Sequence, residues 1–110
     1  MSTRQLAPFL GLALAIVAST AGMAGAAGKT VTLKDIRFSS PRVAISKGTV
    51  VTFRFLDADT THNVTSVGKK RFQSISDRES GSKRVRFATA GTYRYVCTLH
   101  PGMSGRITVR

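Results

Sequence analysis

The sequence predicts an all-β fold, a two-sheet antiparallel β-sandwich, for the chain that follows residue 26. Helical periodicity is missing there, and short runs rich in Val, Thr, Phe and Tyr recur between Gly, Ser and Pro residues. Apolar and polar residues alternate in several runs, as in Val51, Phe53 and Phe55, which buries one face of each strand. A single sheet of this length would leave its apolar face uncovered, so we expect two packed sheets.

A secretory signal peptide is predicted before this domain. Residues 6–17 form an apolar run behind Arg4, and this run is shorter than the roughly 20 residues that a membrane-spanning helix needs. Ala24-Gly25-Ala26 offers a small-residue cleavage site, so we expect a signal peptide over 1–26. The remaining residues, 27–110, are enough for one hydrophobic core and too few for two, so they form a single domain.

Seven strands are predicted in that domain. Their expected ranges are 30–38, 42–46, 49–56, 63–67, 83–88, 91–97 and 106–110. The polar, basic segment 68–82 is expected to be an exposed excursion with a short strand near residues 72–75. In the strand 91–97, alternation places Tyr93, Tyr95 and Cys97 on the inner face. Tyr93 follows a glycine turn, the usual setting of a tyrosine corner whose hydroxyl bonds back to the chain, so its predicted role is structural.

The loop before the last strand, "CTLHPGM", concentrates the candidate metal ligands. Cys97 is the one cysteine of the chain, and an unpaired thiol in an exported domain needs a reason, although a buried inert thiol is one alternative. His100 and Met103 follow at three-residue intervals, and in so tight a turn the three side chains can converge on one point. Thiolate, imidazole and thioether together favour copper, and a Cys with two His and a weak axial Met is typical of blue-copper electron-transfer sites.

The second histidine of such a site must be His62, because the chain has no other. It precedes Cys97 by 35 residues and begins a predicted strand that can lie beside the strand 91–97. A lone histidine is more often an ordinary surface or core residue. Here both histidines are used and none is left over, which favours His62 as a ligand.

These residues resemble the cupredoxins, the small type 1 blue copper proteins. "YRYVCTLHPGMSGRITV" resembles their C-terminal copper loop, and the likeness extends upstream through "SPRVAISKGTVVTFRF" and "HNV". The Cys-x-x-His-x-x-Met spacing is most similar to the amicyanins, since plastocyanins and pseudoazurins carry longer loops. The resemblance implies a Greek-key sandwich in which His62, Cys97 and His100 bind copper and Met103 is a distant axial ligand. It also implies that the Asn63 backbone N–H bonds the cysteine sulfur and that its side chain bonds Thr98.

The predicted function is one-electron transfer by a copper ion that cycles between Cu(II) and Cu(I). Four protein ligands leave no open position for a substrate, and no histidine remains for a second copper cluster or a hydrolytic base, so an enzyme is not expected. A copper-delivery protein of the same fold is the alternative. A basic anion- or nucleic-acid-binding module is a remote one, because no stacking platform of aromatic residues is evident.

The basic charge of the chain predicts the chemistry of its partners. Without Arg4, 16 basic residues face five acidic ones. Lys69, Lys70 and Arg71 follow the strand that begins at His62, and Lys83, Arg84 and Arg86 precede the strand 91–97. We therefore expect part of this charge near the copper and an acidic redox partner. We expect a periplasmic or otherwise exported monomer that is free of the membrane after cleavage and binds no nucleic acid.

Overall fold

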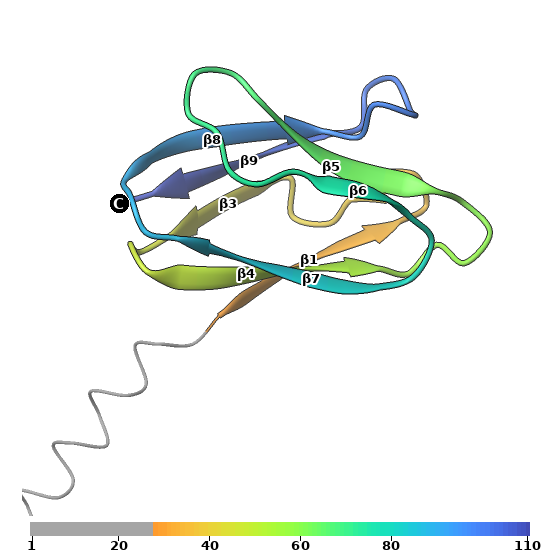
Figure 1. Ribbon diagram of the computed structural model, residues 1–110, viewed down its shortest axis with the longest axis horizontal. Helices are drawn as coiled ribbons and strands as arrows, with labels where there is room; N and C mark the ends of the chain where they lie inside the picture. Colours follow the sequence, from red (N-terminus) through yellow and green to blue (C-terminus); the bar gives the residue numbers. More distant parts are fainter. Residues whose placement is uncertain (1–27) are drawn as a thin grey trace, which may run out of the picture.

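The computed structural model describes residues 28–110, which form two packed β-sheets (Figure 1). The predicted signal peptide and its cleavage site lie outside these residues. Within the described range no helix is long and apolar enough to span a membrane.

Nine strands make up the two sheets of the described chain. They are β1 (Lys29–Lys34), β2 (Arg37–Phe38), β3 (Arg42–Ile45), β4 (Thr49–Phe55), β5 (His62–Val67), β6 (Ile75–Arg78), β7 (Gly81–Phe87), β8 (Gly91–Val96) and β9 (Ser104–Val109). One sheet has the order β2-β1-β4-β7 and the other β3-β9-β8-β5-β6. The prediction of an all-β, two-sheet sandwich is confirmed.

Neither sheet is wholly antiparallel, which corrects one part of the prediction. β1 pairs with β4 in parallel, and β3 pairs with β9 in parallel, while the other strand pairs are antiparallel. The chain crosses to the second sheet between β1 and β4, so these two neighbours run in the same direction. Alternation within a strand reports which face is buried but not which strand lies alongside, so the sequence pattern could not reveal this.

The predicted strand over 30–38 is broken by a two-residue turn. Asp35 and Ile36 both have φ of 54°, and the strands on either side pair through Lys34 and Arg37. A two-residue hairpin loop favours positive φ at both central positions, which usually selects Asn-Gly or Asp-Gly. Ile36 is β-branched and therefore strained in this conformation, so no ordinary turn signal marked the break.

The segment 68–82 is packed more closely on the core than its composition suggests. Phe72 lies against the core, with its ring stacked on Phe53 at 6.2 Å and edge-on to Phe87 at 5.3 Å. The strand of this segment is β6, three residues later than expected, and its first residue, Ile75, is buried. The polar residues around Phe72 remain exposed, so composition alone concealed one aromatic anchor.

The inner face of β8 is confirmed, since Tyr93, Tyr95 and Cys97 are all buried. Tyr93 forms the expected corner by donating its hydroxyl to the carbonyl of Thr89 at 2.8 Å. Tyr95 differs because its buried hydroxyl has no hydrogen-bond partner among the described residues, and burial raises its pKa. Its ring crosses β9 at Gly105, where an added Cβ would lie 2.5 Å from the ring, so that position has no room for a side chain.

The two tyrosines predict opposite effects of removing a hydroxyl. Tyr95→Phe should raise the free energy of unfolding by about 1 kcal/mol, because it removes a buried donor that makes no bond. Tyr93→Phe should lower it by about 1 kcal/mol, because the Thr89 carbonyl loses its donor. Urea denaturation of the metal-free proteins measures both changes. Destabilisation by both substitutions would contradict the assignment for Tyr95.

Candidate metal centre

The loop from Cys97 to Met103 is closed by backbone hydrogen bonds at the end of β8. The N–H of Cys97 donates to the carbonyl of Met103 at 3.0 Å, and the N–H of Met103 donates to the carbonyl of His100 at 3.2 Å. Gly102 turns the chain with φ of 84°, a conformation that glycine adopts without strain. The loop therefore holds Cys97, His100 and Met103 together just before β9 begins.

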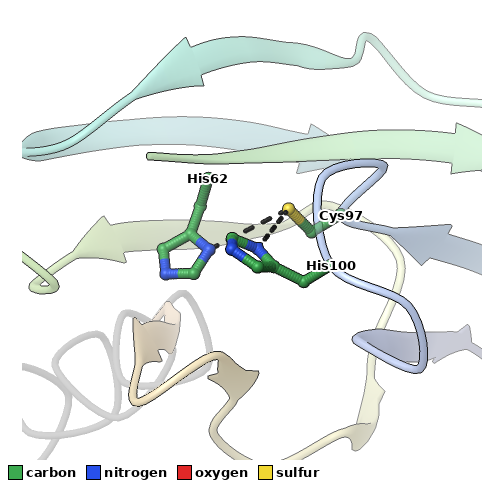
Figure 2. Close-up of side chains that lie close together, drawn as sticks. All are labelled: His62, Cys97 and His100. Atoms are coloured by element: carbon green, nitrogen blue, oxygen red, sulfur yellow. Dashed lines mark hydrogen bonds between the residues drawn. The ribbon is translucent and has the colours of Figure 1, made fainter. Parts of the chain in front are cut away.

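Three donor groups converge at this end of the sandwich (Figure 2). The sulfur of Cys97 lies 3.9 Å from Nδ1 of His62 and 3.5 Å from Nδ1 of His100. All three ligand atoms lie within 4.8 Å of one another. His62 and Cys97 are buried and His100 is partly exposed, so the cluster reaches the surface through His100. Met103 is buried in the same loop.

The spacing of the donors fits a single metal ion. Metal–nitrogen and metal–sulfur bonds of roughly 2.0 and 2.3 Å in a trigonal plane separate the nitrogen from the sulfur by about 3.7 Å. The two observed separations, 3.9 and 3.5 Å, lie on either side of this value. One thiolate, two imidazoles and a nearby thioether form the set that selects copper. The donor chemistry and the geometry therefore agree on a copper ion.

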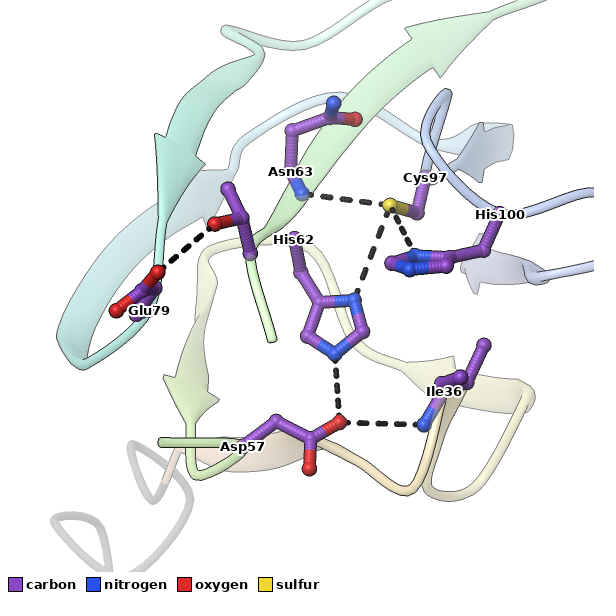
Figure 3. Close-up of polar contacts among 8 residues, drawn as sticks. Ile36, Asp57, His62, Asn63, Glu79, Cys97 and His100 are labelled. Atoms are coloured by element: carbon purple, nitrogen blue, oxygen red, sulfur yellow. Dashed lines mark hydrogen bonds and ion pairs between the residues drawn. The ribbon is translucent and has the colours of Figure 1, made fainter. Parts of the chain in front are cut away.

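The ring of His62 is oriented by Asp57 from outside the cluster (Figure 3). Nε2 of His62 lies 2.7 Å from Oδ2 of Asp57, which also accepts the backbone N–H of Ile36 at 3.2 Å. These hydrogen bonds, that from His62 first, hold the pKa of Asp57 below its ordinary value. An ionised carboxylate only accepts, so the ring proton belongs on Nε2, which leaves the Nδ1 lone pair directed at the cluster.

Asn63 connects β5 to the loop from Cys97 to Met103, which we name the ligand loop. Its backbone N–H contacts the sulfur of Cys97 at 3.5 Å. Its side-chain amide donates to Thr98 Oγ1 at 2.8 Å and to Asp77 Oδ1 at 2.9 Å, while Oδ1 accepts the N–H of Thr98 at 3.1 Å. Thr65 Oγ1 donates to the same oxygen at 2.8 Å. With its donors and acceptor all used, this amide fixes the distance between His62 and Cys97.

The structure brings the predicted residues together, and the two hydrogen bonds expected of Asn63 are present. The roles of His62, Cys97, His100 and Met103 in binding copper stay predictions. Asp57 and Asp77 also contact this cluster or its partners, and no sequence pattern indicated either of them. Asp57 stands five residues before His62 in a loop that also contains Asp59, and no fixed spacing distinguishes a carboxylate that orients a histidine from one in solvent.

The expected placement of basic charge beside the site is wrong for Lys69, Lys70 and Arg71. These residues follow the far end of β5, and their loop lies at the opposite end of the sandwich from the ligand loop (Figure 1). The ammonium group of Lys70 lies over the ring of Tyr93, 6.0 Å from the ring centroid. Tyr93, on β8, precedes Cys97 by four residues. Lys69, Lys70 and Arg71 are close to His62 in sequence, but they are far from His62 in space because the whole of β5 lies between them.

Comparison with known proteins identifies related chains. The family described as "Cupredoxin-like domain" matches residues 7–109. Amicyanin-alpha of Methylorubrum extorquens is 35% identical over 102 residues, which cover 88% of this chain and 85% of that protein. A methionine-to-alanine variant of amicyanin with Cu(I) superposes with a TM-score of 0.67 at 25% identity, over 76% of this chain and 82% of that chain. The purple cupredoxin from Nitrosopumilus maritimus shares the fold, with a TM-score of 0.67 at 21% identity, over 74% of this chain and 99% of its own.

The contact between Asp57 and His62 predicts a specific effect on metal binding. Asp57→Ala should weaken copper affinity by about 10- to 100-fold, because the ring loses the acceptor that orients it. The loss should be greater for Cu(II) than for Cu(I), since the carboxylate charge favours the more highly charged ion, so the reduction potential should rise. Competition with chelators and voltammetry measure the two effects.

Asp59→Ala is the matched control, because Asp59 is an exposed acid of the same loop. Asp57→Asn retains an acceptor for Nε2 without the charge, so its copper affinity should lie between those of the wild type and Asp57→Ala. Equal affinities and potentials in the Asp57→Ala and Asp59→Ala proteins would contradict the orienting role.

Proposed function

This chain belongs to the cupredoxin-like domain family, and we propose that it is an exported one-electron carrier with a type 1 copper centre bound by His62, Cys97, His100 and Met103. The observation that carries the proposal is the convergence of a cysteine sulfur and two histidine Nδ1 atoms within 4.8 Å at the end of β5 and β8. The similarity to amicyanin-alpha over most of both chains supports the same function.

The residues of the chain prepare the site for electron transfer. Copper supplies a redox couple whose two states differ by one electron. The hydrogen bonds of Asn63 and Asp57 hold Cys97 and His62 in place, so little rearrangement is needed when the charge changes. The Asn63 N–H directed at the sulfur helps to fix the position of the Cys97 side chain. His100 is the partly exposed ligand, and it provides the route by which an electron reaches the surface.

Partner proteins would meet the site near His100. Leu99 is 45% exposed beside it and Pro101 is exposed on the other side, which gives the protein surface an apolar contact at this point. Apolar contacts of this kind dock partners without requiring a fixed network of polar bonds. Redox partner proteins are therefore the natural counterparts of this surface, and His100 lies between its two apolar residues.

A copper-delivery protein of the same fold is the second candidate. It would have to release the ion to an acceptor, whereas three of the four proposed ligands are buried and the loop is closed by its own hydrogen bonds. This burial favours retention of the metal and therefore the carrier. An enzyme is not proposed, because four protein ligands leave no position for a substrate.

Copper loading tests the proposal directly. The copper-loaded chain should be intensely blue or green from thiolate-to-Cu(II) charge transfer, and it should be reduced and reoxidised reversibly. Cys97→Ser should abolish the colour and leave a folded sandwich, as judged by far-UV circular dichroism. Thr92→Ala, at an exposed position of β8 outside the cluster, serves as a control and should keep the colour. A colourless copper complex of the wild-type chain would refute the type 1 centre.

Export predicts a defined mature form. Expression of the whole chain in a Gram-negative host should yield periplasmic protein whose mass corresponds to cleavage after Ala26, since the preceding residues have the layout of a signal peptide. Mass spectrometry of the periplasmic fraction gives the mature N-terminus. Full-length chain confined to the cytoplasm would contradict the proposed export.

A further inference from the structure

The outer face of the five-stranded sheet carries three arginines in one row. Arg106 on β9 stands opposite Arg42 on β3 and also opposite Arg94 on β8. The residues that flank them along their strands point into the core and are buried: Val43, Ile107, Tyr93 and Tyr95. Neighbouring strands lie about 4.8 Å apart, so three guanidinium groups share one strip of surface. We name Arg42, Arg106 and Arg94 the arginine row.

The charge of the arginine row is not neutralised within the described chain. Like charges directly opposite each other destabilise a sheet. Among residues 28–110 no lysine or arginine lies within 4.0 Å of a carboxylate of an acidic residue. In addition, none of the three strands that carry the row contains an acidic residue that could offset the repulsion between the arginines. Packing does not require these side chains, because they lie on the outer face of the sheet.

All five acidic residues of the chain lie on other elements than the arginine row, around the metal centre, and none of them lines the groove beside the row. Asp57 bonds His62, Asp77 bonds Asn63 and Glu79 bonds Thr61. Asp35 and Asp59 occupy the turn after β1 and the loop after β4 at the same end. The fold therefore separates an acidic rim from a basic sheet face.

A shallow groove of about 630 Å³ extends from the arginine row toward the metal centre. Pro41, Val96 and Ser104 line it together with the row. Val96 directly precedes Cys97, and Arg94 precedes Cys97 by three residues, a span of about 10 Å at 3.3 Å per residue. A partner held on this face would therefore lie close to the proposed copper ligands.

We propose that the arginine row and its groove form a docking surface for an acidic protein, and that this protein is a redox partner of the centre. The inference rests on the proposed function for the partner's redox role. Each guanidinium can bind a carboxylate through two parallel N–H bonds, so a row of three matches an acidic strand or loop laid across the sheet. Partner carboxylates would also remove the repulsion within the row.

An anionic membrane is the less suitable occupant. Surface-bound proteins add apolar residues that enter the lipid to their electrostatic attraction. The large apolar side chains that are exposed in the described chain are Ile36, Leu56 and Leu99, and none lines the groove. A basic face without exposed apolar residues that could enter the lipid favours a protein surface rich in Asp and Glu as its partner.

The test compares binding of the copper-loaded chain to poly-L-glutamate in two charge variants. The row variant carries Arg42→Gln, Arg94→Gln and Arg106→Gln. The control variant carries Arg54→Gln, Arg84→Gln and Arg86→Gln, three exposed arginines on β4 and β7 of the other sheet. Both variants lose the same net charge. At low salt the row variant should bind the polymer about 3- to 100-fold more weakly than the wild type, because it loses three exposed ion pairs whose free energies add. The affinity of the control variant should fall much less.

Salt dependence and binding to lipid vesicles distinguish a specific protein-docking surface from attraction by net charge and from membrane binding. Raising the salt from about 0.01 to 0.1 M shortens the Debye length from ~30 to ~10 Å and should reduce the difference between row variant and wild type. Equal losses in the two variants would overturn the docking surface and show that net charge alone binds the polymer. Tighter binding to phosphatidylglycerol vesicles than to poly-L-glutamate, with loss in the row variant, would overturn the acidic-protein assignment in favour of a membrane.

Absorption spectra separate this inference from the proposed function. Blue colour in all three proteins with equal polymer affinities overturns the arginine row and leaves the carrier intact. A colourless wild-type chain that still binds the polymer through the row refutes the copper carrier and, with it, the redox role of the partner. If the triple variant does not fold, Arg94→Gln and Arg84→Gln provide the same comparison with one charge each.

Discussion

The pairing of β5 with β8 is the constraint on which the metal centre depends. The register Thr65 to Val96 sets the two strands so that His62, at the start of β5, meets Cys97, just past the end of β8. Asn63 completes this arrangement, because its side chain bonds both the hydroxyl and the backbone N–H of Thr98. Two residues that lie 35 positions apart in the sequence are thereby held as neighbours by the fold itself, so folding contributes to ordering the proposed ligands.

The surroundings of the centre divide its proposed ligands into fixed and accessible ones. His62 is fully buried and its ring is held by Asp57, which is itself tied to the strained turn at Ile36. His100 is on the ligand loop, partly exposed between Leu99 and Pro101. One histidine therefore sets the geometry, and the other connects the centre with the surface. Strain at Ile36 is consistent with this arrangement, because the turn delivers its N–H to the carboxylate that orients His62.

Sequence patterns were sufficient for the features that depend on local chemistry. Alternation in β4 and β8 located the buried faces, the glycine before Tyr93 indicated the tyrosine corner, and the spacing of Cys97, His100 and Met103 indicated a metal loop. The turn at Asp35 and Ile36 was not predictable, because its backbone conformation opposes the preference of isoleucine. Asp57 was not predictable either, since a single carboxylate gains its role only from the position of His62 in space.

The placement of charge depends on topology more than on sequence order, and it changes how partners are to be understood. Lys69 and Lys70 are close to His62 in sequence, but β5 separates them by its whole length. Arg42 and Arg106 are 64 residues apart in sequence and directly opposite in the sheet. An anionic partner approaching this molecule would meet an acidic rim at the metal end and a basic sheet face beside it. Electrostatic attraction would therefore orient such a partner sideways, against β3, β9 and β8, while short-range apolar contact at Leu99 remains the route for partners without strong charge.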